Sequence, residues 1–353
     1  MTPDTLFSDI CRILSDGDTP INTEKVRSLT VSRLDVSITA EATERVYGEA
    51  MGISRAKYPQ VLLCGYYGFG NIGDDALLRA SVERSHLELP HASVGALTRR
   101  GGKDSSLFGI PCFKRSNSLT LWGKIKRCKR FILGGGTLLQ EYTSLRSLAY
   151  YCALVAIAKR CGASVYLWGN GLGYPKTSIG AALMKSALKK CDGIGIRDRD
   201  SVALARHLAP HSRIYFENDL ALSVARAEGE RADRLIYELW GDKTPKFIIV
   251  APKRGDGLSD LEKAVAEAVK NSLALCWISM HKNEDTAVVK RMIGRYGGKQ
   301  LSGVGYADLV ALAERSAGVY SMRLHALIAA ASAGVPYRAF GSDKKLQTVA
   351  EAR

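Results

Sequence analysis

The chain has 353 residues, of which 46% are hydrophobic and 24% charged, which is typical of a globular protein and excludes a disordered or fibrous one. The formal net charge of +15 favours an anionic partner: a phosphate-bearing substrate, nucleic acid or an acidic membrane surface. Alternatively, the excess of lysine and arginine is spread over the solvent-exposed surface and reflects no particular partner. No apolar stretch is long enough to span a membrane and no signal peptide is visible, so we expect a cytoplasmic protein.

Residues 1–57 differ in character from the rest of the chain. Helices are expected at 3–15 and 40–51, around a segment rich in Thr, Ser and Asp, and no catalytic motif is present. We therefore interpret residues 1–57 as an N-terminal helical extension of unknown function.

From Gln60 onward, short apolar runs alternate with amphipathic stretches in two successive series. Strands are expected at 61–67, 93–98, 130–136, 163–169, 192–198 and 213–219, and then at 246–253, 274–281, 318–323 and 335–341. Helices are expected at 74–87, 144–162, 179–191 and 200–208, and then at 258–272, 285–296, 307–314 and 324–333. This alternation predicts two Rossmann-like α/β domains with parallel sheets, over residues 58–225 and 226–353.

A basic run from Lys124 to Arg130 leads into one of these strands. It predicts a solvent-facing helix end, and peripheral contact with an anionic membrane is the alternative. The eight cysteines form no C-x-x-C pair, which indicates reduced thiols and predicts neither disulfides nor a metal site.

The segment GYYGFGNIGDDALL, Gly65 to Leu78, joins the first strand to the first helix, at the sheet edge where such folds bind ligands. It contains a G-x-G-x-x-G match to a dinucleotide fingerprint. However, the next strand ends in Arg99 where an acidic residue is expected, and the Asp74–Asp75 pair sits where a pyrophosphate would lie. A sugar contact is therefore favoured, and a plain strand-to-helix turn with an N-capping Asp is the alternative. The candidate ligand-binding residues are Gly68, Gly70, Asn71, Gly73 and Asp74.

Other motifs also fall at expected strand ends. Three glycines from Gly134 precede a Thr, Ser and Arg-containing segment that suits a hydroxylated or anionic ligand, although a glycine turn and an ordinary capped helix fit as well. A second glycine-rich segment begins at Gly169. The candidate binding residues of these two motifs are Gly135, Gly136, Thr137, Arg146 and Gly171.

Two further motifs carry charge at strand ends. Arg197 directly follows an apolar strand, where a guanidinium can bind a carboxylate or phosphate, although an exposed Arg/Asp cluster is the alternative. Arg323 and His325 lie at a strand-to-helix junction and could bind an anion and move a proton, whereas a lone histidine there would be a packed one. Lys345 follows the last strand and would add a positive group, or lie in a solvated loop.

Together these segments resemble the polysaccharide pyruvyl transferase family, and within it the cell-wall-anchoring branch of bacteria. The resemblance runs from about Val61 to Lys345 and is carried by GYYGFGNIGDDALL, GGGTLLQ-x-x-TS-x-RSL-x-YY, IRDRDS and MRLHALI-x-A-x-x-GVP. The chain departs from the family pattern at Glu141, where Asp is common, at Asn170, where Gln is expected, and before Lys345, where Tyr-Asp-Pro is usual.

The resemblance implies a GT-B-like fold, with two Rossmann-like domains facing a cleft. It implies phosphoenolpyruvate as donor and a glycan sugar, often lipid-linked, as acceptor, with a cyclic pyruvate ketal and phosphate as products. No cofactor, metal or nucleic acid is expected, and no oligomeric state is implied. Arg197, Arg323 and Lys345 would hold the donor, His325 would transfer protons, and the first glycine loop would hold the acceptor.

Three alternatives stay open. A sugar-nucleotide glycosyltransferase would use the same two-domain layout and release a nucleotide, and a dinucleotide oxidoreductase would bind NAD(P). A basic glycan- or membrane-binding module would bind without turnover.

Overall fold

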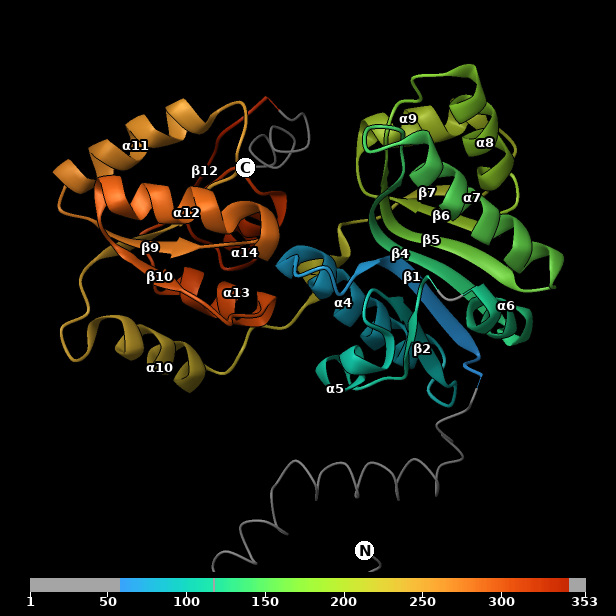
Figure 1. Cartoon of the computed structure of the whole chain (residues 1–353), viewed down its shortest axis with the longest axis horizontal. Helices are drawn as coiled ribbons and strands as arrows, with labels where there is room; N and C mark the ends of the chain where they lie inside the picture. The colour runs from blue at the N-terminus through green and yellow to red at the C-terminus, as the bar shows by residue number, and fades with distance from the viewer. Residues whose placement is uncertain (1–57, 117, 343–353) are drawn as a thin grey trace, which may run out of the picture. The chain divides into compact units, whose positions relative to one another are not determined.

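The computed structural model describes residues 58–116 and 118–342, and these residues form a seven-stranded and a five-stranded parallel sheet flanked by helices (Figure 1). The first sheet has the order β3-β2-β1-β4-β5-β6-β7. Its strands are β1 (Val61–Tyr67), β2 (Val94–Thr98), β3 (Cys112–Lys114), β4 (Arg130–Leu139), β5 (Ser164–Leu172), β6 (Gly193–Ile196) and β7 (Ile214–Phe216). The α/β class with two parallel sheets is thus confirmed, while the expected N-terminal extension and Lys345 lie outside the described residues.

The second sheet has the order β10-β9-β8-β11-β12. Its strands are β8 (Phe247–Ala251), β9 (Ala274–Ile278), β10 (Lys299–Leu301), β11 (Val319–Ser321) and β12 (Tyr337–Ala339). The helices along the described chain are α4 (Ile72–Glu88), η1 (Gly101–Asp104), α5 (Ser105–Phe108), α6 (Ser118–Arg127), α7 (Leu145–Arg160), α8 (Ser178–Leu188), α9 (Arg199–Leu208), η2 (Leu220–Ser223), α10 (Gly229–Trp240), α11 (Leu258–Lys270), α12 (Lys282–Tyr296), α13 (Tyr306–Glu314) and α14 (Leu324–Ser332).

Both faces of each sheet are buried, which is why the strands read as continuous apolar runs in the sequence. In β1, Val61 and Leu63 point to the face covered by α4, whereas Leu62 and Cys64 point to the face covered by α7 and α8. This alternation follows from the period of two residues in a strand. All four side chains are at most 1% exposed.

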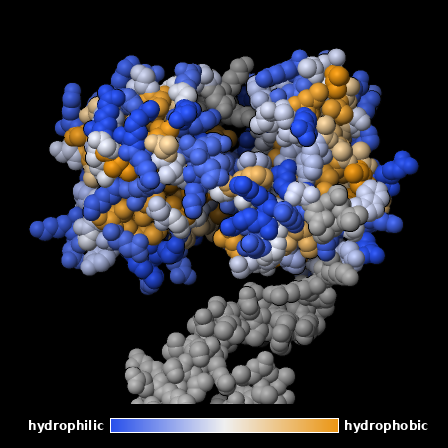
Figure 2. Space-filling model, viewed as in Figure 1, coloured by the Kyte–Doolittle hydropathy of each residue, from blue (hydrophilic) through white to orange (hydrophobic). Residues whose placement is uncertain are grey.

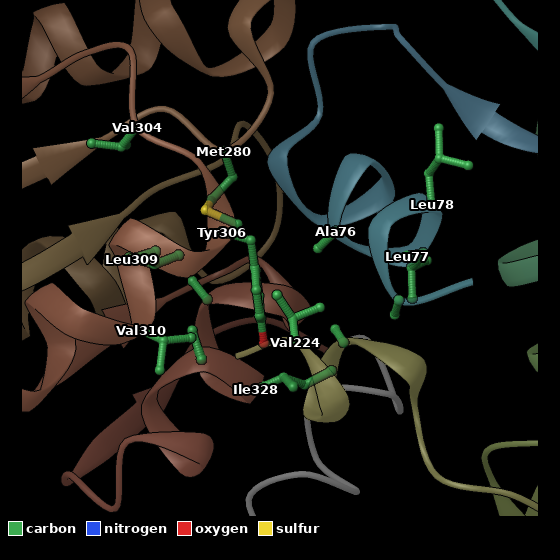
Figure 3. Packing of buried hydrophobic residues seen from close by; sticks show 14 of the residues in the cluster. Ala76, Leu77, Leu78, Val224, Met280, Val304, Tyr306, Leu309, Val310 and Ile328 are labelled. Atoms are coloured by element: carbon green, nitrogen blue, oxygen red, sulfur yellow. The ribbon is translucent and has the colours of Figure 1, made fainter. Parts of the chain in front are cut away.

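Apolar residues of α4 share one core cluster with residues of α13 and α14 (Figure 3). Ala76 and Leu77 of α4 belong to this cluster, as do Tyr306 and Ile328. Figure 3 shows the Tyr306 ring reaching toward Val224, which follows η2. Helix α4, which begins beside the first glycine loop, is therefore packed against helices of the second sheet.

Two glycine motifs that were expected to follow strands instead lie within strands β4 and β5. Strand β4 continues through Gly136 to Leu139, and β5 continues through Gly171 to Leu172. The pairing of these two strands shifts register between Gly136 and Leu139. The predicted strand ends at 136 and 169 were too early. The glycines suggested turns, but pairing between β4 and β5 extends both strands, and this pairing is not visible in either segment alone.

The basic run forms the end of α6, as predicted, and Lys126, Arg127 and Lys129 are exposed. Lys124 is the exception, because it is only 8% exposed. Its Nζ lies 3.9 Å from the centre of the Phe113 ring and 4.8 Å from that of Tyr58, so aromatic faces hold the ammonium group.

Candidate functional site

Arg197 and Asp219 form the centre of a polar cluster at the carboxyl ends of the first sheet. Arg197 directly follows β6, and Asp219 follows β7, the neighbouring strand. The two side chains form an ion pair, and each is only 8% exposed. Asp219 Oδ1 also accepts a hydrogen bond of 2.9 Å from the Ala221 amide, so both partners are fixed in place. Burial alone would raise the pKa of Asp219, but Arg197 and His325 outweigh it and hold that pKa below its usual value.

His325 reaches this pair from the second sheet. It lies in the first turn of α14, two residues after Arg323, and its Nε2 is 3.9 Å from Asp219 Oδ2. The Nε2 atom is buried and has no hydrogen-bond partner within the part of the chain that is described. Burial lowers the pKa of His325 to about 4, with the Asp219 carboxylate opposing the shift and Arg197 adding to it. The imidazole is therefore neutral at neutral pH and can accept a proton.

Gly73 makes room for His325. A Cβ placed on Gly73 would lie 2.1 Å from His325 Nδ1 and 2.3 Å from its Cγ, far inside van der Waals contact. The imidazole therefore lies directly against the backbone of the first turn of α4. This is a close approach that no side chain at position 73 would allow.

Asp74 follows Gly73 and lies near the charges of Arg197, Asp219 and Arg323. Burial raises its pKa to about 7, the neighbouring Asp75 adds to the shift, and Arg197 opposes it. A Cβ on Gly136, which has a φ of 74°, would lie 3.7 Å from Asp74 Oδ1. The carboxyl group is thus about half protonated near neutral pH and can donate a proton.

Arg323 is held by acidic residues of α12. Its Nε donates to Asp285 Oδ2 at 3.1 Å and its Nη2 donates to Glu284 Oε2 at 2.8 Å. Burial would lower the pKa of Arg323, but these hydrogen bonds outweigh it and raise the pKa. The sequence did not reveal these partners, which fix the guanidinium beside the junction of β11 and α14.

Further predicted residues line the Arg197 side of the cluster. Arg197 Nη2 donates to Thr137 Oγ1 at 3.4 Å, and a Cβ on Gly171 would lie 2.9 Å from the same oxygen. Gly135 lies in β4, two strands away from β6, and its carbonyl accepts a hydrogen bond of 2.9 Å from Asn170 Nδ2 of the intervening β5. Asn170 Oδ1 is buried without a partner in the described ranges, so it offers a free acceptor here.

Other predicted residues stabilise the first glycine loop, between β1 and α4. Asn71 caps α4 by accepting from the Gly73 amide at 3.0 Å, so the cap is this Asn and not an Asp. Gly68, with a φ of 75°, donates its amide to Asp75 at 3.0 Å, and the Gly70 carbonyl accepts from the Lys282 amide at 2.9 Å. Arg146 is exposed in the first turn of α7, and no hydrogen bond or ion pair within the described chain ties it to the cluster.

Sequence reasoning missed Asp219 and His281. Asp219 could have been found as an acidic residue just past a strand, the criterion that selected Arg197. His281 follows β9, forms an isolated antiparallel bridge with Asn71, and is 6% exposed. Both of its ring nitrogens lack hydrogen-bond partners among the described residues, and Nε2 lies 3.9 Å from Glu284 Oε1.

The arrangement combines two fixed guanidinium groups with a carboxyl group that titrates near neutral pH and an imidazole that is neutral there. Two guanidiniums provide more N–H donors than their carboxylate partners use, which suits a small ligand with several anionic oxygens. The carboxyl of Asp74 and the imidazole of His325 have pKa values shifted in opposite directions, as in acid–base pairs of enzymes. Within residues 58–116 and 118–342, no group of three His, Cys, Asp or Glu side chains is arranged to hold a metal ion.

Comparisons with known proteins identify the family and the fold. Residues 71–344 match the family model described as polysaccharide pyruvyl transferase, whereas no curated protein matches the chain significantly. Among solved structures, the chain is similar to UDP-GlcNAc 2-epimerase of Neisseria meningitidis bound to UDP-GlcNAc, with 12% identity, a TM-score of 0.54, and 82% and 84% of the two chains covered.

Two more solved structures share the architecture. UDP-GlcNAc 2-epimerase of Methanocaldococcus jannaschii has 10% identity, a TM-score of 0.53, and coverage of 82% and 91%. A glycosyltransferase of Rickettsia africae has 10% identity, a TM-score of 0.50, and coverage of 82% and 81%. At such low identity these likenesses establish the GT-B-like fold and nothing about substrates.

Proposed function

The chain belongs to the polysaccharide pyruvyl transferase family, and from this premise we propose that it transfers a pyruvyl group from phosphoenolpyruvate to a sugar of a cell-surface glycan precursor. The product is a cyclic pyruvate ketal, and phosphate is released. The observation that supports this most is the cluster of Arg197, His325 and Asp74, which brings a fixed guanidinium next to an imidazole and a carboxyl group with shifted pKa values. The cell-wall-anchoring branch is the one whose motifs the chain resembles.

The donor suits the Arg197–His325 side of the cluster. Phosphoenolpyruvate carries a carboxylate and a phosphate, and Arg197 and Arg323 bind such groups by paired hydrogen bonds. Lys345 is proposed as a third cation. A bound anion would raise the pKa of His325 from about 4, which prepares the imidazole to hold a proton during the reaction.

The reaction needs two proton transfers and two new C–O bonds. A proton is added to C3 of the enol, which makes C2 electrophilic, and one sugar hydroxyl attacks C2. Phosphate leaves C2, the second hydroxyl closes the ring, and the two hydroxyl protons balance the proton on C3 and the one carried by phosphate. We propose His325 as the main proton carrier and Asp74 as the second. Asp74 titrates near neutral pH, and a bound anion would raise the pKa of His325 toward neutrality.

The acceptor is proposed to lie on the α4 side, beside Asp74 and the glycine loop. Gly68, Gly70 and Asn71 shape that loop, as their backbone contacts show, and would act on the acceptor through its conformation. Glu141, a departure from the family pattern, braces a nearby loop by accepting from the Lys176 and Thr177 amides at 2.6 and 3.0 Å.

We also propose a cytoplasmic location with peripheral contact to an anionic bilayer, through the surface of α7 and α8. No helix of the described chain has the length and apolarity needed to cross a membrane. Residues 142–191 include no acidic residue, and exposed apolar residues gather over these helices (Figure 2). The basic residues of this segment are Arg146, Lys159, Arg160, Lys176, Lys185, Lys189 and Lys190. Exposed Tyr142, Tyr174 and Ile179 would enter the interface while the lysines contact anionic headgroups.

A donor comparison tests the proposed function. The purified chain is incubated with a membrane extract of glycan precursors and with either phosphoenolpyruvate or a panel of nucleotide sugars. Acceptor-dependent phosphate release from phosphoenolpyruvate is expected, and His325→Ala should abolish it. Turnover of a nucleotide sugar without use of phosphoenolpyruvate would instead identify a glycosyltransferase.

A further inference from the structure

Arg115 is a half-buried cation on the first sheet. It follows β3, and its Nη1 donates to the Gly65 carbonyl at 3.2 Å. Its guanidinium lies 4.8 Å from the ring centre of Tyr150 and 5.3 Å from that of Tyr151. Within the described residues it forms no ion pair with a carboxylate. Burying a charge without an opposite charge is costly, so a half-buried arginine of this kind is suited to an anion from outside the chain.

Arg99 is a second cation for which the described residues provide no ion pair, and strand register places it next to Arg115. Thr98 pairs with Lys114 across β2 and β3, so Arg99 and Arg115 follow paired residues at the same edge of the sheet. Their guanidiniums lie 5.2 and 5.6 Å from the centre of the Phe69 ring. Arg100, by contrast, is neutralised by Asp104, to which its Nε donates at 2.6 Å.

An aromatic pair links these arginines to the cluster around Asp74. The rings of Tyr66 and Phe69 are stacked, with centres 3.9 Å apart and planes 9° apart. Tyr66 is 39% exposed. Burial raises the pKa of Tyr66, and the nearby carboxylates of Asp74 and Glu284 add to the shift. The exposed Tyr66 ring therefore lies between the two arginines and the Asp74 carboxyl group.

We propose that Arg99 and Arg115 bind a diphosphate group that joins the acceptor glycan to its carrier, with the acceptor sugar lying on Tyr66. Two guanidiniums on neighbouring strands present forked donors to two adjacent anionic groups, and an exposed aromatic ring suits the apolar face of a sugar. The placement of the sugar rests on the proposed function, whereas binding of a diphosphate at the arginines does not.

The donor is a poor occupant of this subsite. Phosphoenolpyruvate must lie within reach of His325, whose ring packs against Gly73 at the other side of the first glycine loop. Arg99 and Arg115 are associated instead with β1, β2 and β3, on the far side of the sheet from β6 and β7. The two arginines thus extend the site toward the carrier end of the acceptor.

Calorimetric titration tests the inference with inorganic pyrophosphate as the probe. We expect the Arg99→Gln and Arg115→Gln double variant to weaken pyrophosphate binding by about tenfold or more, because charge-assisted hydrogen bonds are lost. Arg206→Gln with Arg234→Gln removes the same charge from exposed helix positions and should leave binding unchanged. Arg99→Gln alone, at an exposed position, guards against misfolding of the double variant and should weaken binding severalfold.

Two further ligands distinguish the source of the diphosphate. Tighter binding of farnesyl diphosphate than of UDP points to a lipid carrier, and the reverse order points to a nucleotide carrier; both orders support the inference if they depend on Arg99 and Arg115. Absence of pyrophosphate binding to the native chain, or equal loss in the control variant, would overturn it. Phosphoenolpyruvate binding by the double variant should match the native chain. Failure of the native chain to use phosphoenolpyruvate would count against the proposed function and not against this subsite.

Discussion

Replacing Gly73 with alanine tests the contact between α4 and His325. The added Cβ would lie 2.1 Å from His325 Nδ1, so the ring must retreat by about 1.3 Å to reach an ordinary contact of 3.4 Å. A displacement of about 1 Å at a catalytic group can cost on the order of 100-fold in rate. We therefore expect Gly73→Ala to lower kcat by about 100-fold. The φ of Gly73 is not positive, so alanine should be tolerated by the backbone itself.

Gly294→Ala is the matched control for this substitution. Gly294 lies in α12, and nothing lies within 4 Å of a Cβ placed on it. It should stabilise the protein by about 0.5–1 kcal/mol, since alanine is the better helix former, and leave kcat unchanged. The assay is phosphoenolpyruvate-dependent phosphate release, with thermal unfolding measured in parallel. A Gly73→Ala enzyme with native kcat would refute the placement of His325 at the reaction centre.

Four other outcomes are expected. His325→Ala should fold normally, by circular dichroism, and lose pyruvyl transfer; a purified variant with near-native activity would exclude His325 as the proton carrier. Arg197→Ala should raise the donor KM, and should also lower stability by about 3–5 kcal/mol because it leaves the buried Asp219 unpaired; an unchanged donor KM would contradict the donor role. Because the pKa of Asp74 is raised to about 7, its protonated carboxyl group stabilises the fold at low pH, and this stabilisation is lost as pH rises from about 4 through about 7. The melting temperature of Asp74→Asn should therefore rise relative to that of the native chain between pH 4 and 8. A constant difference in melting temperature would contradict the pKa shift. Replacing Tyr174 and Ile179 with serine should reduce sedimentation with phosphatidylglycerol vesicles, and equal sedimentation of both proteins would exclude that docking surface.

The strands of the fold were largely predictable, and their ends less so. Strand β1 was predicted at its observed bounds, because a run of apolar residues between glycines is the local pattern of a strand buried on both faces. Strands β3 and β10 were missed because each has three residues and only one fully buried side chain, which gives no periodic signal. Extension of β4 through Gly136 depends on pairing with β5, which a single segment cannot reveal.

The candidate site was predictable where one rule applied: chemistry gathers at the carboxyl ends of parallel strands. That rule brought Arg197, Thr137 and His325 together, as the structure shows. It does not place Arg146, which is exposed in the first turn of α7, and its binding role stays a prediction. Asp219 was missed because its importance arises from two partners, Arg197 and His325, that are distant in sequence and meet it only in the fold.

The most direct measurement of the central claim is the mass of the acceptor glycan. Glycan precursor isolated from a strain lacking this chain would be incubated with the purified chain and phosphoenolpyruvate, then analysed by mass spectrometry. We expect a mass gain equal to pyruvic acid minus one water for each phosphate released, and no gain with His325→Ala. An unchanged glycan mass, or a gain equal to a sugar residue from a nucleotide donor, would contradict it.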